Sequence, residues 1–191
     1  MLQIYTGNGK GKTTAAIGLA IRSLGAGHRV YIMQFMKSLA YSEQMVMNGF
    51  YPQLELHTTT GKPCFIAPEG MLSQEQLAEW GDKVVVFQKG KPPADYVALI
   101  ESGFQEAVQA ALSGRYERVI LDELNMALYF GSLKREAVDD FLAKLPQTVE
   151  LVLTGRCAPD WLIERADLVT EMQEVKHYYQ KGIEARLGIE N

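Results

Sequence analysis

Cysteine is scarce in this sequence, which holds only Cys64 and Cys157. The two form no Cys-x-x-Cys pair, which argues against a structural zinc site, and they are too few for a disulfide framework. This usage is typical of a protein in a reducing compartment, so we expect a cytoplasmic location.

Long apolar runs and an excess of basic residues are absent as well. No stretch approaches the roughly 20 apolar residues of a membrane-spanning helix, and we expect no signal peptide because no basic segment precedes an apolar run at the start. The formal net charge is −4, whereas nucleic-acid binders usually carry a basic surface. We therefore expect neither a membrane nor nucleic acid as a partner.

What the sequence does contain is an alternation of short β-rich apolar runs with longer amphipathic patterns. Its 191 residues suit a single α/β domain. The alternation favours right-handed βαβ units, and hence a mostly parallel sheet with helices on both faces. Periodicity predicts strands at 2–5, 29–35, 53–59, 118–123, 149–155 and 167–172, and helices at 12–24, 94–112, 135–145 and 160–166.

Two regions depart from the alternation. Residues 60–92 are rich in glycine and proline, so we predict irregular structure there, with one short helix near 73–80. The tail, at about 172–191, mixes charged, aromatic and glycine residues. We expect this tail to wrap the surface or to cover a site.

The loop from 6 to 14, TGNGKGKTT, follows the phosphate-binding pattern G-x-x-x-x-G-K-[ST], except that Thr6 replaces its first glycine. It joins a predicted strand to a predicted helix, whose N–H groups and dipole favour an anion. Lys12 supplies a cation to phosphate and Thr13 an oxygen to Mg²⁺. The fold class predicted is thus α/β and P-loop NTPase-like. The alternative is a glycine-rich turn without a ligand.

Polar residues also end two later predicted strands. In a P-loop protein, an acid at the end of a buried run such as RVILDE lies beside the Mg²⁺ of a bound triphosphate. Asp122 and Glu123 would point to opposite sides of an extended chain, so we expect different roles for them; the alternative is a solvated strand end. Arg156 is suited to clamp phosphate, but a surface arginine fits the pattern equally well. The role of His177 in the tail stays open. From the residues alone, a Mg²⁺–ATP site follows, without a named reaction.

A resemblance to a known family adds the reaction. The segments GNGKGKTTAAIG, QFMK, LDEL, LTGR and ADLVTEMQEVKHYYQKGIEARLGIE resemble, in that order, the ATP:corrinoid adenosyltransferases of bacterial cobalamin synthesis and salvage. The resemblance runs over nearly the whole chain. Its most specific part is the tail, which general P-loop enzymes lack, and the threonine-led loop with two lysines is typical of the family.

The resemblance implies an enzyme that transfers the 5′-deoxyadenosyl group of ATP to the cobalt of a reduced corrinoid, cob(I)alamin, and releases triphosphate. Cobalt(I) attacks the ribose C5′ in this reaction. The resemblance also implies that ATP binds reversed, with its γ-phosphate in the place usually taken by the β-phosphate. It further implies a homodimer and a flavoprotein reductant.

The resemblance also implies roles for single residues. Mg²⁺ is held by Thr13 and Glu123, with Asp122 nearby. The catalytic residues are Lys10, Lys12 and Glu123, because cations and Mg²⁺ stabilise the triphosphate as its charge rises. The residues that bind the substrates are Thr6, Gly7, Asn8, Gly9, Lys10, Gly11, Lys12, Thr13, Thr14, Arg156 and Phe65.

Phe65 marks a departure from the family pattern. Relatives carry Phe-x-Trp shortly after a Thr-Gly in the loop of the third strand, and this pair helps to displace the lower axial ligand of cobalt. Here TTTGKPCFIAPEG contains Phe65 and no tryptophan follows. Phe65 is the candidate for this role, and the alternative is that Phe65 and Ile66 cover the core.

Two other functions remain open. A P-loop kinase or ATPase would transfer the γ-phosphoryl group and produce ADP. A non-catalytic nucleotide- or corrinoid-binding module would bind without turnover.

Overall fold

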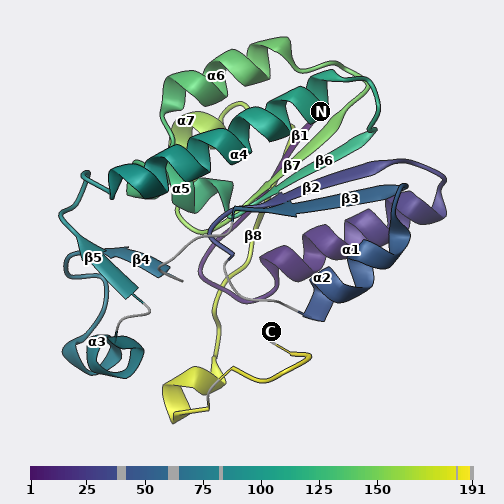
Figure 1. The fold of residues 1–191 in the computed structure, drawn as a ribbon. Coiled ribbons are helices and arrows are strands. Elements are labelled where there is room, and N and C mark those ends of the chain that lie inside the picture. The colour runs from purple at the N-terminus through teal and green to yellow at the C-terminus, as the bar shows by residue number, and fades with distance from the viewer. Residues whose placement is uncertain (38–41, 60–64, 82–83, 184, 190–191) are drawn as a thin grey trace.

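The computed structural model describes residues 1–37, 42–59, 65–81, 84–183 and 185–189. Its centre is a six-stranded sheet in the order β3-β2-β6-β7-β1-β8, and its strand pairs are parallel (Figure 1). The six strands that we predicted are confirmed, with ends that differ by one residue at most. They are β1 (Leu2–Thr6), β2 (Val30–Gln34), β3 (Leu54–Thr58), β6 (Arg118–Asp122), β7 (Glu150–Thr154) and β8 (Leu168–Glu171).

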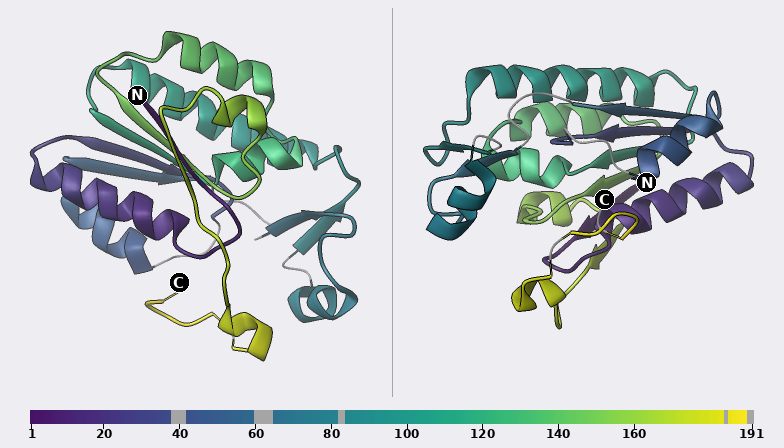
Figure 2. Two further views of the ribbon diagram at one scale, coloured as in Figure 1. Left: turned by 180° about the vertical axis from the view of Figure 1, so that it is seen from behind. Right: turned by 60° about the horizontal axis from the view of Figure 1, so that its bottom comes forward.

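Helices cover both faces of this sheet (Figures 1 and 2). On one face lie α1 (Lys12–Gly25) and α2 (Ser42–Met47), and on the other lie α4 (Ala94–Leu112), α5 (Leu124–Phe130), α6 (Arg135–Lys144) and α7 (Asp160–Ile163). Successive strand residues supply two separate cores: in β2, Tyr31 and Met33 pack on the α4 side, whereas Val30 and Ile32 pack on the α1 side. The predicted α/β class, a mostly parallel sheet with helices on both faces, is confirmed.

A second, two-stranded sheet lies beside the first. It pairs β4 (Phe65–Pro68) with β5 (Val84–Phe87) in parallel, and α3 (Gln74–Trp80) connects them after a capping box formed by Ser73 and Gln76. The predicted short helix is confirmed, but the prediction of irregular structure is wrong for both strands. Each strand is a four-residue segment within a stretch rich in glycine and proline, and its partner lies across α3 in the sequence.

Further short elements that were not predicted include α2, the 3₁₀ turn η1 (Asn48–Phe50) and α5. The start of α5 corrects the expectation that the chain is extended at Asp122 and Glu123. β6 ends at Asp122, and Glu123 has a φ of 63° and forms the N-cap of α5. The chain is therefore not extended at Glu123, because it turns at once from strand to helix.

The tail leaves the sheet after β8, passes beyond the carboxyl ends of the strands and forms the 3₁₀ turn η3 (Tyr178–Lys181) (Figure 1). It then turns back toward α1 (Figure 2). None of the helices in the described ranges is long and apolar enough to span a bilayer.

Candidate functional site

The loop between β1 and α1 ends at a helix N-terminus. Gly11 takes the N-cap position with a φ of 113°, a left-handed conformation that favours glycine, and no side chain of a described residue caps the helix there. The first turn also has no acidic residue. Its N–H groups and the positive end of the helix dipole are therefore available to an anion such as phosphate.

Lys12 is folded back onto this loop. Its ammonium nitrogen Nζ donates to the carbonyl oxygens of Gly7 at 2.7 Å and Gly9 at 2.8 Å, and the side chain is buried. Burial lowers the pKa of Lys12 from its ordinary value; Glu123 opposes this shift and Arg156 adds to it. An ammonium group has three protons, so Lys12 still has one to donate to a phosphate oxygen.

Gly7 and Gly9 allow the chain after β8 to lie directly on the loop. The N–H of Gly9 donates to the carbonyl oxygen of Met172 at 2.6 Å. The N–H of Met172 donates to the carbonyl oxygen of Thr6 at 2.9 Å. A Cβ atom at Gly7 or Gly9 would collide with the Met172 carbonyl group. Thr6, which replaces the first glycine of the usual pattern, is the last residue of β1 and pairs with Glu171 of β8. The altered loop thus supports a strand and the tail on its outer side.

Asp122 is buried behind the loop and accepts three hydrogen bonds. Its Oδ1 accepts from the hydroxyls of Thr13 at 2.9 Å and Thr154 at 2.6 Å, and its Oδ2 accepts from the amide of Gln34 at 3.2 Å. Gln44 in α2 in turn donates to Gln34 at 2.8 Å. The carboxylate therefore links α1, β2, β6 and β7 at the carboxyl edge of the sheet.

Glu123 is the acid that reaches the cavity. Its backbone N–H donates to the hydroxyl of Thr154 at 3.0 Å, which fixes the turn between β6 and α5. Burial, and to a lesser degree the negative charge of Asp122, raise the pKa of Glu123 to about 7. Lys37, Lys12 and Arg156 act in the opposite direction. A nearby cation would lower this raised pKa, because a cation stabilises the ionised form of a carboxyl group.

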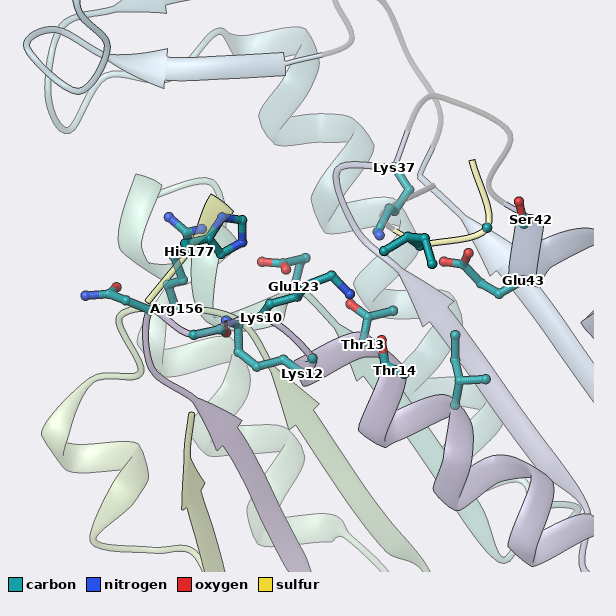
Figure 3. Close-up of a pocket in the computed structure, with 16 residues that line it drawn as sticks. Lys10, Lys12, Thr13, Thr14, Lys37, Ser42, Glu43, Glu123, Arg156 and His177 are labelled. Carbon is teal, nitrogen blue, oxygen red and sulfur yellow. Dashed lines mark hydrogen bonds between the residues drawn. The ribbon is translucent and has the colours of Figure 1, made fainter. Parts of the chain in front are cut away.

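A cavity of about 510 Å³ opens above the loop (Figure 3). Among the described lining residues, four are cations, Lys10, Lys12, Lys37 and Arg156, and two are carboxylates, so these walls favour an anion. The cavity is also large enough for a nucleotide-sized ligand. The other lining residues are Asn8, Gly9, Gly11, Thr13, Thr14, Ile17, Ser42, Glu43, Glu123, His177, Gly188 and Ile189.

The structure brings most of the predicted site residues to this cavity. Residues 8–14, Glu123 and Arg156 line it. Thr6, Gly7 and Asp122 are not among the described lining residues, because Thr6 and Gly7 lie under the tail and Asp122 lies behind Thr13. The side chain of Phe65, like the Gly61–Cys64 segment before it, lies outside the described part of the chain.

Several lining residues were not predicted. Lys37 ends the QFMK segment, which carried the family resemblance but was given no site role, and it follows β2 at the carboxyl edge of the sheet. Ser42 and Glu43 belong to α2, a six-residue helix too short to give a clear period. Gly188 and Ile189 reach the cavity only because the tail turns back, and no local sequence signal indicates that turn.

Comparisons with known proteins agree with this geometry. The family model described as ATP:corrinoid adenosyltransferase BtuR/CobO/CobP matches residues 1–191. The chain is 32% identical to a corrinoid adenosyltransferase of Pseudomonas aeruginosa over 100% of its own length and 83% of that protein. It is 30% identical to the corrinoid adenosyltransferase of Escherichia coli K12 over 98% of its own length and 83% of that protein.

Among solved structures, a KaiC-like protein from Pyrococcus horikoshii aligns with a TM-score of 0.45 and 15% identity, over 92% of this chain and 74% of that one. This likeness is too low to bear on function. The family match spans the whole length of the sequence and includes the loop, both acids and the tail. The chain therefore belongs to the ATP:corrinoid adenosyltransferase family BtuR/CobO/CobP.

Proposed function

We propose that this protein transfers the 5′-deoxyadenosyl group of ATP to the cobalt of a reduced corrinoid and releases triphosphate, in adenosylcobalamin synthesis or salvage. The observation that carries the proposal is the cation-lined cavity at the start of α1, in a chain that belongs to this family over its full length. In the reaction, the electron pair of cobalt(I) forms the bond to C5′. The C5′–O bond breaks, and its electron pair goes to the triphosphate.

Because negative charge rises on the leaving triphosphate, the main task of the protein is electrostatic. Lys10, Lys12 and Arg156 all line the cavity and are proposed to bind this group. Lys12 is already held by two loop carbonyl groups, so it needs little reorganisation when phosphate arrives. Preorganised cations of this kind stabilise a transition state whose charge exceeds that of the ground state.

We propose Mg²⁺ as the metal of this site. Within the described residues, no three His, Cys, Asp or Glu side chains form a metal site of their own. Mg²⁺ does not require such a group, because it is commonly held by one or two carboxylates together with substrate phosphates and water. The hydroxyl of Thr13 and the carboxylates of Asp122 and Glu123 are oxygen donors that fit it. When bound, Mg²⁺ would neutralise charge on the triphosphate.

The reversed ATP is proposed from the family resemblance, and the altered loop is compatible with it. The loop is closed on its outer side by Met172, and its first position is a strand residue instead of glycine. The proposed reaction also needs C5′ to face the corrinoid, so the triphosphate must be held at its far end. The tail is proposed to cover the site, because its described residues His177, Gly188 and Ile189 line the cavity.

The decisive experiment is anaerobic incubation with ATP, Mg²⁺ and chemically reduced cobalamin, followed by identification of the products. Adenosylcobalamin and triphosphate in equal amounts are expected. ADP and phosphate would instead indicate a kinase or ATPase, and binding without turnover would indicate a carrier module. Omission of the corrinoid serves as control, because triphosphate release should then stop. A homodimer and a flavoprotein reductant are further proposals from the family, to be tested by sedimentation and by reduction assays.

A further inference from the structure

His177 in the tail has one imidazole nitrogen in use and one available. Its Nδ1 accepts a hydrogen bond from the backbone N–H of Tyr179 at 3.1 Å. A ring nitrogen that accepts a hydrogen bond carries no proton, so the proton of the neutral ring lies on Nε2. Within the described part of the chain, Nε2 makes no hydrogen bond. The ring thus presents an N–H donor on the side away from Tyr179.

The residue that carries this donor lines a cavity whose described walls favour anions. His177 lines the same cavity as Lys10, Arg156 and Glu123, although it is more than 160 positions from the loop in sequence (Figure 3). Two of these neighbours are cations. A neutral N–H donor in the same wall can add a directed hydrogen bond to the general attraction of the positive charges.

The tail holds the ring in a defined orientation. The ring centroids of His177 and Tyr178 are 4.5 Å apart, and the guanidinium of Arg186 lies 4.7 Å from the centre of the Tyr178 ring. At its start, the tail is fastened to the loop by the hydrogen bonds of Met172 with Thr6 and Gly9. A donor supported in this way loses little conformational freedom when a ligand binds.

We propose that His177 binds the triphosphate of ATP through its Nε2–H group and stabilises it as it leaves. This inference rests on the proposed adenosyl transfer, because it assigns the residue to the leaving group of that reaction. No proton passes from His177 to the substrate. The hydrogen bond strengthens as the electron pair of the C5′–O bond moves onto the triphosphate, so the residue contributes to binding and to the rate.

A purely structural role for His177 makes a different prediction. The residue forms the N-cap of η3, and asparagine is among the best N-cap residues. In His177→Asn the shorter side chain keeps an acceptor for the N–H of Tyr179 but has no group at the position of Nε2. A structural role therefore predicts that His177→Asn behaves as the wild type, whereas a triphosphate role predicts that it fails as His177→Ala does.

The first measurement is the affinity of the protein for inorganic tripolyphosphate by titration calorimetry, without corrinoid or turnover. We expect the dissociation constant to rise about tenfold or more in both His177→Ala and His177→Asn, the effect of losing one hydrogen bond to a charged group. Lys176→Ala is the matched control, because Lys176 is exposed and adjacent, and it should change affinity much less. Unchanged affinity in His177→Asn, or an equal loss in Lys176→Ala, would overturn the proposal.

The second measurement is steady-state adenosylation with cobalt(I) supplied ready-made. Both His177 variants should lower kcat by about tenfold or more, with the KM for corrinoid unchanged. A selective rise in the corrinoid KM would instead assign His177 to the other substrate. If the wild type makes no adenosylcorrinoid, the proposed function fails, whereas the tripolyphosphate titration still decides whether His177 binds polyphosphate.

Discussion

At the scale of single residues, Lys12 combines a structural and a chemical task. Two of its three ammonium protons bind the carbonyl oxygens of Gly7 and Gly9, which leaves one for phosphate. Lys12→Ala should therefore lower transition-state stabilisation by about 2–4 kcal/mol, the range for losing one preorganised donor. The measurement is kcat/KM for ATP. Near-native kcat/KM in a folded variant would show that the loop is not the triphosphate site.

The two acids should differ in their effect on the metal. Glu123 lines the cavity, whereas Asp122 is buried and accepts from Thr13, Thr154 and Gln34. Glu123→Gln should raise the Mg²⁺ concentration required for half-maximal activity more than Asp122→Asn does. Mg²⁺ titrations of both variants at saturating ATP test this ranking. The opposite order would assign the metal to Asp122.

At the scale of elements, the contact between the loop and the tail depends on the absence of a side chain at Gly9. A Cβ atom there would meet the backbone of Met172 and Gln173. Gly9→Ala should therefore cost about 1–3 kcal/mol of stability and weaken ATP binding, because either the loop or the tail must move.

The matched control for this change is Gly18→Ala. Gly18 lies on the exposed side of α1, where a Cβ atom meets nothing within 4 Å, and alanine should stabilise the helix by about 0.5–1 kcal/mol. Chemical denaturation of both variants supplies the comparison. Equal stabilisation by the two substitutions would mean that the tail does not bind the loop in solution.

The β4–β5 sheet contains Phe65, the residue predicted to contact the corrinoid. Phe65 begins β4, and its role against the corrin, which the family resemblance suggests, stays a prediction. A side chain packed against the lower face of the corrin would exclude the axial ligand and ease reduction of cobalt(II). Phe65→Ala should then impair adenosylation when cobalt(II) is reduced in the site by a weak protein reductant, and much less when cobalt(I) is supplied. Equal damage in both assays would point to lost folding or lost corrinoid binding.

At the scale of the whole molecule, the raised pKa of Glu123 links folding to pH. Its pKa is near 4.5 when unfolded and about 7 in the folded protein without ligands. Between these values the folded state binds more protons, so this group makes the protein less stable as pH rises. Glu123→Gln removes the effect.

We therefore expect Glu123→Gln to raise the melting temperature at pH 8 more than at pH 5, in the presence of a chelator. Thermal denaturation of wild type and variant at both pH values measures this difference. Added Mg²⁺ with tripolyphosphate should reduce the advantage at pH 8, because a bound cation favours the ionised carboxylate. An advantage that is larger at pH 5 would contradict the assignment.

Local sequence patterns were enough to predict the main sheet, its long helices and the phosphate-binding loop. These features rest on local signals: alternating apolar runs give β1, β2, β3, β6, β7 and β8, and periodicity gives α1 and α4. The glycines and Lys12 allow the loop to be predicted, because the turn, the helix start and the cation are adjacent in the chain. Residues 8–14 could be predicted for the same reason, whereas Glu123 and Arg156 were assigned from predicted strand ends and from the family resemblance; all of them line the cavity.

The closure of the site and the turn that separates its two acids depend on tertiary contacts. Glu123 leaves the extended conformation because its N–H bonds to Thr154, a residue 31 positions away that no local pattern connects to it. Lys37, Glu43 and Ile189 reach the cavity from three segments whose proximity depends on the packing of α2 and the return of the tail. Local propensity encodes turns and periods, whereas a wall built from distant segments exists only once the sheet has brought them together.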